Sequence, residues 1–398
     1  MPPWCNCANA TANRALAKPP LAACAGLRLT GGMTAHLTPL ANSLPSTVPF
    51  VGPETQERAL GRAFRARLGA NESMFGPSPL AITAMQSAAA TAWMYGDPEN
   101  HDLKTALATH HGVAPGNIVV GEGIDGLLGY LVRLLVASGD KVVTSLGAYP
   151  TFNFHVAGFG GDLIRVPYLG NFEDPAALLA AAHTHKAKLI YLSNPDNPMG
   201  SHHPASVITS MIEGLPDGCL LVLDEAYIDL APDGTAATVA ADDPRVIRMR
   251  TFSKAYGLAG LRVGYAIAAP ALAQAFDKLR NHFGVGRVAQ AGALAALQDQ
   301  SHINHVRAQV IRARHRLIQI AAENGITALP SATNFTCLDL GRDGEHARAT
   351  LRALTDLAVF VRMPGVAPHD RCIRISHGTP TALDIFAKAL PRAIKSLG

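Results

Sequence analysis

Short apolar runs alternate with longer stretches of helical periodicity between residues 115 and 270. Runs that are apolar throughout are typical of strands buried on both faces, as in parallel sheets that helices cover. Seven runs fit this description, at 117–121, 141–145, 162–168, 188–194, 219–225, 246–253 and 262–268. After the first of them, Leu127, Leu131, Leu134 and Leu135 share one helical face. The pattern predicts an α/β fold with a mostly parallel sheet.

The pattern changes after residue 300. A long helical stretch, 301–325, ends at a glycine, strand-like runs follow at 334–340 and 371–377, and a last helix begins near Ala382. A chain of 398 residues, 48% of them hydrophobic, is long enough for a large domain and a smaller one. We predict a large domain over 93–300 and a small α+β domain over 301–398. Residues 45–92 are expected to form an N-terminal arm and part of the small domain.

The N-terminal region has a composition of its own. No acidic residue precedes Glu54, and prolines and glycines interrupt the stretch, so we predict a disordered extension over residues 1–44. Translation could also begin at Met33, and a targeting peptide is a third interpretation of residues 1–32.

Charge and composition exclude several classes of function. The formal net charge is +4, but Arg14, Lys18 and Arg28 lie in the first 32 positions, so the rest is close to neutral. No basic run with interleaved aromatic residues occurs, which argues against nucleic-acid binding. No apolar stretch approaches the roughly 20 residues that a membrane span needs. The six cysteines lack C-x-x-C spacing and the histidines lack zinc-ligand spacing, so we expect no metal site and a reducing, cytoplasmic location.

A glycine-rich turn follows the first apolar run. Gly121, Gly123 and Gly126 form the G-x-G-x-x-G pattern of dinucleotide-binding proteins. Such a site also needs an acidic residue about 20 positions on, at the end of the next strand, and the run 141–145 has none. What remains is a strand, a tight turn and a helix N-terminus whose free amides favour an anion. The motif predicts a site for a single phosphate, and a nicotinamide dehydrogenase is an alternative that rests on the glycines alone.

Polar side chains stand at the ends of three further runs, where open parallel sheets bind their ligands. Lys254 follows 246–253; such a lysine is a nucleophile if it is desolvated, and otherwise a surface residue. Asp224, near the end of 219–225, needs a partner, which could be a helix N-terminus, a cation or the nitrogen of a pyridine ring. Asn197 lies in a turn before a proline, and its amide and the phenol of Tyr227 could both contact such a ring.

These motifs, in this order, resemble those of the class I and II aminotransferases, pyridoxal 5′-phosphate enzymes of fold type I. The similarity is greatest to the histidinol-phosphate aminotransferases and covers roughly residues 45–398. It rests on "NPDNPMG" (194–200), "DEAY" (224–227) and "SKAYGLAGLRVG" (253–264), among other motifs. The resemblance implies a large domain with a mostly parallel sheet, a smaller α+β domain, and a homodimer.

The resemblance also implies roles for individual residues. Lys254 would bind the cofactor covalently and move a substrate proton, Asp224 would pair with the ring nitrogen, and Tyr227 would contact the ring oxygen. Tyr95 in "YGDPENHDL" would reach the phosphate of the neighbouring subunit. The other cofactor-binding positions serve the phosphate, the ring oxygen or the ring face: Gly123, Ile124, Asp125, Phe152, Asn197, Thr251, Ser253 and Arg262.

Substrate-binding positions follow from the same resemblance. Arg374 would bind a carboxylate of the amino acid or of 2-oxoglutarate through two hydrogen bonds. Arg362 matches the position associated with the distal phosphate of the substrate. Asn71 and Glu72 would line the substrate entrance, and Asn334 matches a further family position. The implied reaction is a ping-pong transfer of an amino group, with histidinol phosphate as donor and 2-oxoglutarate as acceptor.

The sequence departs from the family motifs in three places. "GEGID" (121–125) replaces "GNGSD" and loses a hydroxyl contact, and Asp196 and Met199 stand where the family prefers Asn and Thr. Arg287 is unexpected, and is either an extra cation near the substrate entrance or a surface residue. The donor therefore stays open to aromatic or other amino acids. A decarboxylase resembling threonine-phosphate decarboxylase is an alternative, whereas a ligand-sensing regulator would need a helix-turn-helix domain that residues 1–44 are too short to form.

Overall fold

The computed structural model describes residues 36–45 and 51–397. Residues 45–398 form one compact unit, and residues 1–44 belong to a second unit. In this second unit the described residues contain helix α1 (Pro39–Ser43), which Thr38 caps and which has no buried residue. Residues 1–35 of the predicted extension, Met33 included, lie outside the described residues.

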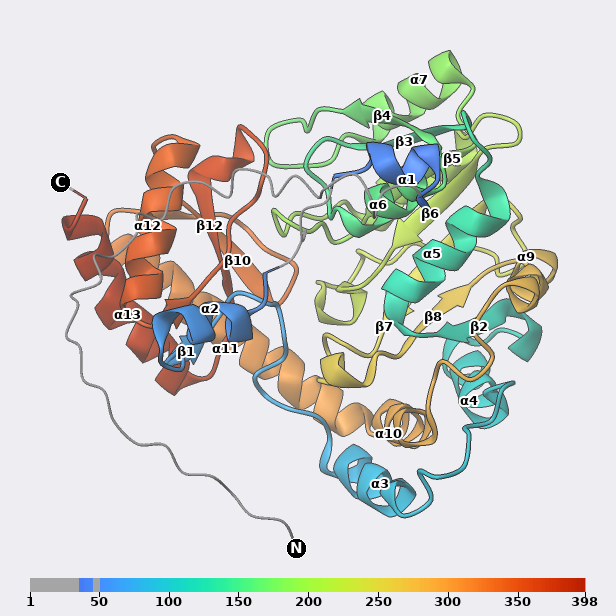
Figure 1. Ribbon diagram of the computed structural model, residues 1–398, viewed down its shortest axis with the longest axis horizontal. Helices are drawn as coiled ribbons and strands as arrows, with labels where there is room; N and C mark the ends of the chain where they lie inside the picture. The colour runs from blue at the N-terminus through green and yellow to red at the C-terminus, as the bar shows by residue number, and fades with distance from the viewer. Residues whose placement is uncertain (1–35, 46–50, 398) are drawn as a thin grey trace, which may run out of the picture. The chain divides into compact units, whose positions relative to one another are not determined.

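A seven-stranded sheet forms the centre of the larger unit (Figure 1). Its strands, in the order in which they pair, are β2 (Ile118–Gly121), β8 (Gly264–Ile267), β7 (Val246–Thr251), β6 (Leu220–Asp224), β5 (Leu189–Ser193), β3 (Lys141–Ser145) and β4 (Asp162–Val166). All neighbours are parallel except the two pairs that contain β8. Each apolar run forms a strand, and the predicted α/β fold with a mostly parallel sheet is confirmed.

The strand order excludes a dinucleotide-binding unit around the glycine-rich turn. In such a unit the strand before the turn and the next strand along the chain are neighbours. Here β2 lies at the edge of the sheet, and β8, β7, β6 and β5 separate it from β3. The nicotinamide alternative therefore lacks the required topology.

Helices cover both faces of this sheet because successive strand residues point to opposite sides. On one face, α5 (Gly123–Leu135), α6 (Thr151–Gly158) and α9 (Pro270–Ala275) pack on residues such as Tyr191. On the other face, α7 (Pro175–His185) and α8 (Ala205–Glu213) pack on residues such as Ile190. Leu127 and Leu131 of α5 are buried as predicted, whereas Leu134 and Leu135, in its last turn, are half-buried against the same cluster.

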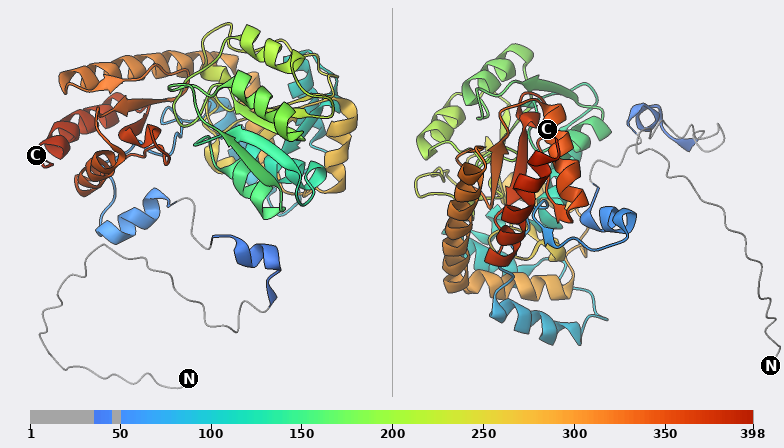
Figure 2. Two further views of the ribbon diagram at one scale, coloured as in Figure 1. Left: turned by 90° about the horizontal axis from the view of Figure 1, so that it is seen from above. Right: turned by 90° about the vertical axis from the view of Figure 1, so that its left-hand side faces the viewer.

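A second group of elements carries the C-terminal part of the chain. Strands β10 (Phe335–Asp339) and β12 (Cys372–Ser376) pair antiparallel, with β9 (Thr327–Ala328) beside β10, and β1 (Ala66–Arg67) pairs with β11 (Val359–Phe360). Helices α11 (Gln300–Glu323), α12 (Gly344–Asp356) and α13 (Pro380–Lys395) share one apolar cluster with these strands, and α11 and α13 run side by side (Figure 2). Strand β1 connects the predicted arm to this group. The exact domain boundaries stay predictions, since residues 45–398 form one unit.

The remaining α-helices of the larger unit lie before β2 or between β8 and α11. They are α2 (Pro53–Leu60), α3 (Pro79–Ala89), α4 (His101–His111) and α10 (Arg287–Gln298). Buried residues of α3, α4, α10 and α11 share a cluster with the outer strand residues Val120 and Tyr265. This cluster fixes the antiparallel edge of the sheet, which carries the glycine-rich turn.

Candidate active site

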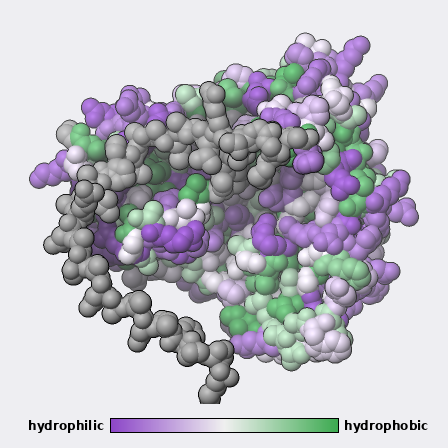
Figure 3. Space-filling model, viewed as in Figure 1, coloured by the Kyte–Doolittle hydropathy of each residue, from purple (hydrophilic) through white to green (hydrophobic). Residues whose placement is uncertain are grey.

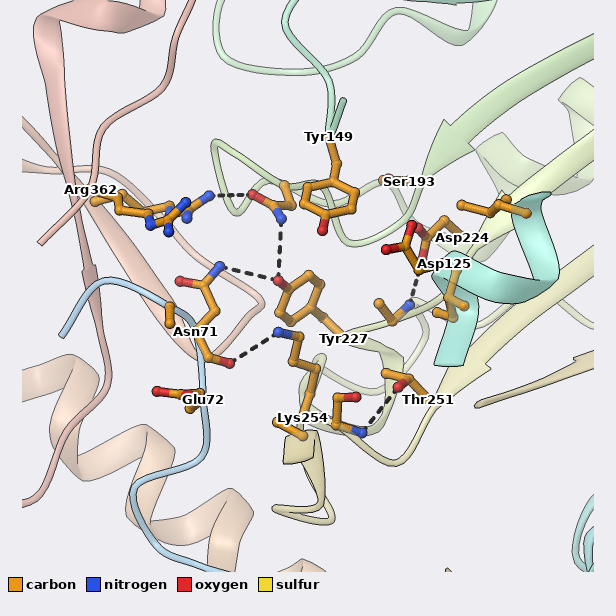
Figure 4. A pocket seen from close by; sticks show the side chains of 18 of the residues that line it. Asn71, Glu72, Asp125, Tyr149, Ser193, Asp224, Tyr227, Thr251, Lys254 and Arg362 are labelled. Carbon is orange, nitrogen blue, oxygen red and sulfur yellow. Dashed lines mark hydrogen bonds between the residues drawn. The ribbon is translucent and has the colours of Figure 1, made fainter. Parts of the chain in front are cut away.

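A cavity of about 340 Å³ lies where β5, β6 and β7 end, facing the antiparallel sheet of β10 and β12 (Figure 4). Segments distant in sequence meet there, from residue 69 to residue 374. The predicted residues that line it are Asn71, Glu72, Ile124, Asp125, Asn197, Asp224, Tyr227, Thr251, Ser253, Lys254, Arg262, Arg362 and Arg374. The strand-end residues therefore form one site.

Lys254 has the environment of a nucleophilic amine. Its Nζ donates to the carbonyl oxygen of Asn71 at 3.2 Å and lies 5.5 Å from the ring centroid of Tyr227. Burial, and then the positive charges of Arg374 and Arg262, lower the pKa of Lys254 to about 8. A substantial fraction of the amine is therefore neutral near physiological pH and can form a covalent bond with a carbonyl group.

Asp224 ends β6 and is held by two hydrogen bonds. The Tyr191 hydroxyl donates to Oδ2 at 2.6 Å, and the Ala226 amide donates to Oδ1 at 2.9 Å. Burial raises the pKa of the Asp224 carboxyl, because its negative charge has lost the stabilisation of water. A cationic ring nitrogen at this place would restore a partner to that charge.

Tyr227 is the centre of a hydrogen-bond network in the cavity. Its hydroxyl oxygen accepts from Asn71 Nδ2 at 3.2 Å and from Asn197 Nδ2 at 3.4 Å. Arg374 donates in turn to Asn197 Oδ1. Burial raises the pKa of the Tyr227 phenol, which keeps its proton available for donation to an oxygen atom in the cavity.

Close backbone packing supports one side of the cavity from behind. Gly121, Gly264 and Thr251 form one row across β2, β8 and β7. A Cβ atom on Gly264 would lie 2.7 Å from the carbonyl carbon of Gly123, so the two backbones touch. This contact places the first turn of α5, with Ile124 and Asp125, at the cavity wall.

The same side of the cavity has the donors that a phosphate group requires. Gly123 has a φ of +75°, and a Cβ there would lie 2.5 Å from Arg262 Nη2. Arg262 Nη1 donates to Ser253 Oγ at 3.3 Å, and the Ser253 amide donates to Thr251 Oγ1 at 3.0 Å. A helix N-terminus, hydroxyl groups and one guanidinium thus converge, as phosphate recognition needs. The residues present fit the phosphate of a pyridoxal cofactor.

Two arginines occupy the opposite side of the cavity, and Figure 4 shows Arg362 across from Asp125 and Thr251. The backbones of Arg362 and Arg374 form an antiparallel bridge, with N···O distances of 3.3 and 2.6 Å. The Arg374 guanidinium lies 5.1 Å from the ring centroid of Phe335, and Arg362 Nη2 donates to the Val51 carbonyl at 2.9 Å. Burial and the charge of Arg374 lower the pKa of Arg362. An anionic substrate group would compensate both charges.

The predicted ring-stacking residue does not line the cavity. Phe152 is fully buried and stacks on Tyr191, with ring centroids 4.7 Å apart and an interplanar angle of 13°. Because α6 begins at Thr151, Phe152 lies in its first turn and packs in the apolar cluster that α5, α6 and α9 form with the sheet. Tyr149, three residues earlier, lines the cavity instead (Figure 4). Tyr149 and Ser193 are the main site residues that the sequence reasoning missed, although both stand at or just after strand ends.

Gly123 lies just behind the cavity wall, against Arg262, and three other positions singled out in the sequence also lie outside the wall. Asn334 stands behind it and donates to the Asn71 carbonyl at 2.9 Å. Tyr95 is 77% exposed and packs against Phe283, with ring centroids 4.7 Å apart. Arg287 donates to the Tyr95 carbonyl at 2.8 Å and lines a separate cavity beside α3, α4 and α10. Arg287 therefore does not line the candidate active site of its own subunit.

Within residues 36–45 and 51–397, no group of three or more His, Cys, Asp or Glu side chains is arranged to hold a metal ion. No helix in these ranges is long and apolar enough to cross a membrane.

Known proteins are similar to this chain in sequence and in fold. The model of the family "Aminotransferase class I and II" matches residues 66–390. The chain is 34% identical over 352 residues to the histidinol-phosphate aminotransferase of Moorella thermoacetica, covering 87% of this chain and 90% of that one. The crystal structure of histidinol-phosphate aminotransferase from Sinorhizobium meliloti in complex with pyridoxal-5′-phosphate is 53% identical. It covers 92% of this chain and 99% of that chain with a TM-score of 0.89.

A more distant relative extends the comparison to the fold alone. A mutant aspartate aminotransferase from Thermus thermophilus, 23% identical, aligns with a TM-score of 0.75 over 89% of this chain and 99% of that chain. Both the predicted family and the predicted fold type I architecture are thus confirmed. From its sequence match, its fold and its active-site geometry, the chain belongs to the class I and II aminotransferases.

Proposed function

We propose that the cavity binds pyridoxal 5′-phosphate and that the enzyme transfers an amino group from histidinol phosphate to 2-oxoglutarate. The observation that carries the proposal is that the cavity has groups for binding anions on two opposite sides. Arg262 and the first turn of α5 form a phosphate-binding side that faces the paired Arg362 and Arg374, and all of these line the same cavity as Lys254.

The cofactor, when bound, supplies a ring that withdraws electrons from the substrate Cα. Lys254 would hold the cofactor covalently until the amino group of the donor replaces it, and its freed amine would then be placed to move the proton at the substrate Cα. Asp224 holds a proton on the ring nitrogen, since a buried carboxylate favours a cationic partner. Tyr227 and Asn197 bind the ring oxygen, and Tyr149 takes the ring-stacking role first assigned to Phe152.

The two arginines account for the substrate pair. Arg374 binds the carboxylate of the oxo acid, and Arg362 binds the phosphate ester of the donor. Both substrates are anions, and each guanidinium offers parallel donors to a carboxylate or phosphate. Alternating donor and acceptor in this one site gives ping-pong kinetics.

A homodimer is part of the proposal. Trp93 and Tyr95 are 83% and 77% exposed, and Leu80 and Ile82 of α3 are also exposed. Figure 3 shows hydrophobic residues gathered on the face that carries α3 and α10. A second copy would cover these apolar side chains and could receive Tyr95 in its phosphate site.

Three buried free thiols, Cys219, Cys337 and Cys372, agree with the proposed cytoplasmic location.

The substrate assignment is tested with the cofactor-loaded enzyme and a panel of amine donors, with 2-oxoglutarate as acceptor. We expect histidinol phosphate to have the highest kcat/KM, well above that of histidinol. Arg362→Gln should lower kcat/KM for histidinol phosphate by roughly 10- to 150-fold, the value of one charge-assisted hydrogen bond, with a smaller effect on histidinol. A parent enzyme that prefers an unphosphorylated donor would overturn the assignment. Release of CO₂ without glutamate would instead identify a decarboxylase.

Mixing two inactive variants tests whether Tyr95 serves the neighbouring subunit. In a hybrid of Lys254→Ala and Tyr95→Ala subunits, one active site combines an intact Lys254 with a Tyr95 from its neighbour. We expect activity to return on mixing if Tyr95 acts across the interface. Activity that stays at the level of the separate variants would show that Tyr95 serves its own subunit or neither.

A further inference from the structure

Two buried carboxyl groups lie directly behind the active-site wall. Glu173 stands in the loop between β4 and α7, and Asp196 stands in the turn after β5; they are 1% and 2% exposed. Their side chains are hydrogen-bonded to each other. Asp196 is one of the departures from the family motifs, and none of the roles assigned above explains it.

The hydrogen bonds around the pair require it to hold a proton of its own. Glu173 accepts from the Ser145 hydroxyl at 2.5 Å and from the Ser193 amide at 2.9 Å. Asp196 accepts from the Tyr168 hydroxyl at 2.9 Å and from the Met199 amide at 2.9 Å. Ionised carboxylates only accept hydrogen bonds, so the bond between the two groups needs one of them to be protonated.

The surroundings disfavour a second negative charge on the pair. Burial, and then the charge of Asp196, raise the pKa of Glu173 well above its usual range, and burial raises the pKa of Asp196 to about 7. Arg374 is the cation whose charge opposes this shift. The other titratable groups that face the pair are Tyr168, Tyr191, His203, Asp224 and Cys337.

The pair is connected to the active site through both of its members. Asn197, next to Asp196, accepts from Arg374 and donates to Tyr227. Asp196 also closes the turn that presents Asn197, because its carbonyl accepts from the Gly200 amide at 3.1 Å. On the other side, Ser193 donates to the Tyr191 hydroxyl at 3.2 Å, and Tyr191 donates to Asp224. A change in charge at the pair therefore acts on Arg374 and on Asp224.

We propose that Glu173 and Asp196 share one proton and act as positioning residues that keep Arg374 directed at the substrate anion. When the pair loses this proton at higher pH, Asp196 becomes a full anion and competes with the substrate for Arg374. Substrate affinity then falls, while groups that act after binding keep their positions. This inference rests on the proposed role of Arg374 in substrate binding.

The variants Asp196→Asn and Glu173→Gln test the shared proton. Either amide donates one hydrogen bond to the remaining carboxylate, so the pair can carry at most one negative charge at any pH. We expect KM of the parent enzyme for 2-oxoglutarate to rise at least about tenfold as the pair ionises above pH 7, with kcat less affected. In both variants this rise should disappear. Asp174→Asn, which removes a neighbouring charge and keeps the cap of α7, should follow the parent.

Stability provides a readout that needs no substrate. A carboxyl group whose pKa is raised on folding stabilises the protein at low pH and loses that contribution as pH rises through the folded-state value. The melting temperature of Asp196→Asn, minus that of the parent, should therefore increase from pH 6 to pH 9 in the cofactor-loaded enzyme. A difference that is independent of pH, or parallel KM profiles for parent and variants, would overturn the shared proton. The melting-temperature difference does not depend on which donor the enzyme uses. Failure of the substrate assignment can therefore be distinguished from failure of the shared proton.

Discussion

Replacing Gly123 with alanine tests how much the backbone turn at this one residue contributes to cofactor affinity and to stability, apart from the other glycines of the motif. Gly123 has a φ of +75°, where an L-residue costs roughly 1–2 kcal/mol. The new Cβ would also lie 2.5 Å from Arg262 Nη2, and so would displace the guanidinium from the phosphate side of the cavity. One charge-assisted hydrogen bond is worth about 1.5–3 kcal/mol, which corresponds to roughly 10- to 150-fold in Kd.

Gly126→Ala is the matched control, because it changes the third glycine of the same motif. Gly126 lies in α5, where a Cβ would be 3.3 Å from Cβ and Oε2 of Glu122, a contact that a shift of a few tenths of an ångström relieves. Alanine in a helix interior is roughly 0.5–1 kcal/mol more favourable than glycine. We therefore expect Gly126→Ala to bind the cofactor as the parent does and to be as stable or slightly more stable.

Urea unfolding of the cofactor-free proteins measures the backbone cost, and titration with pyridoxal phosphate followed by absorbance measures the cofactor affinity. Gly123→Ala should lose about 1–2 kcal/mol of stability and bind the cofactor at least about tenfold more weakly. Parent-like cofactor affinity in Gly123→Ala would refute the placement of the phosphate against Arg262. Equal losses in both variants would show that the motif acts through helix packing alone.

Three further predictions concern single side chains. Because the pKa of Lys254 is lowered to about 8, the rate at which the cofactor-free enzyme captures pyridoxal phosphate should rise with pH and level off above 8, and Lys254→Ala should lack the covalent absorbance band altogether. Arg374→Lys should raise KM for 2-oxoglutarate roughly tenfold or more with little change in kcat, since lysine cannot form two parallel hydrogen bonds. Glu225 accepts from Arg248 and Arg250 at 3.0 and 2.8 Å, and their charges lower its pKa against the effect of burial. Glu225→Gln should therefore destabilise the protein by about 3–5 kcal/mol at neutral pH in urea unfolding, and the difference from the parent should shrink as pH falls below the usual range of a glutamate.

The sequence was sufficient for those features that depend on local pattern. Uniformly apolar runs become strands because both faces of this sheet are covered, and the residues at their ends meet because parallel strands end at one edge. Lys254, Asp224 and Asn197 could be placed in one site for this reason. The antiparallel placement of β8 between β2 and β7 could not be predicted in the same way, since strand order depends on contacts between distant segments.

Errors arose where the orientation of a side chain depends on where a helix starts. Tyr149 and Phe152 are three residues apart, and only the start of α6 at Thr151 determines which of them faces the cavity. The contact of Arg287 could not be predicted from the sequence either, because its partner is the carbonyl of Tyr95 in a distant loop. The Glu173–Asp196 pair joins loops after two different strands, and no spacing in the sequence reveals that their carboxyl groups meet.

The row of Gly121, Gly264 and Thr251 has a consequence for how this enzyme can vary during evolution. This row lies behind the phosphate side of the cavity, where its peptide groups are in register across three strands and Gly264 supports the backbone of Gly123 and Ile124. Exchanges of neighbouring side chains, such as those that distinguish "GEGID" from the usual motif, leave these peptide groups in place. Gain or loss of a single residue in β2, β7 or β8 would instead shift one strand against the next and invert its faces. Lineages of this enzyme should therefore differ by substitution in these strands and keep their lengths constant.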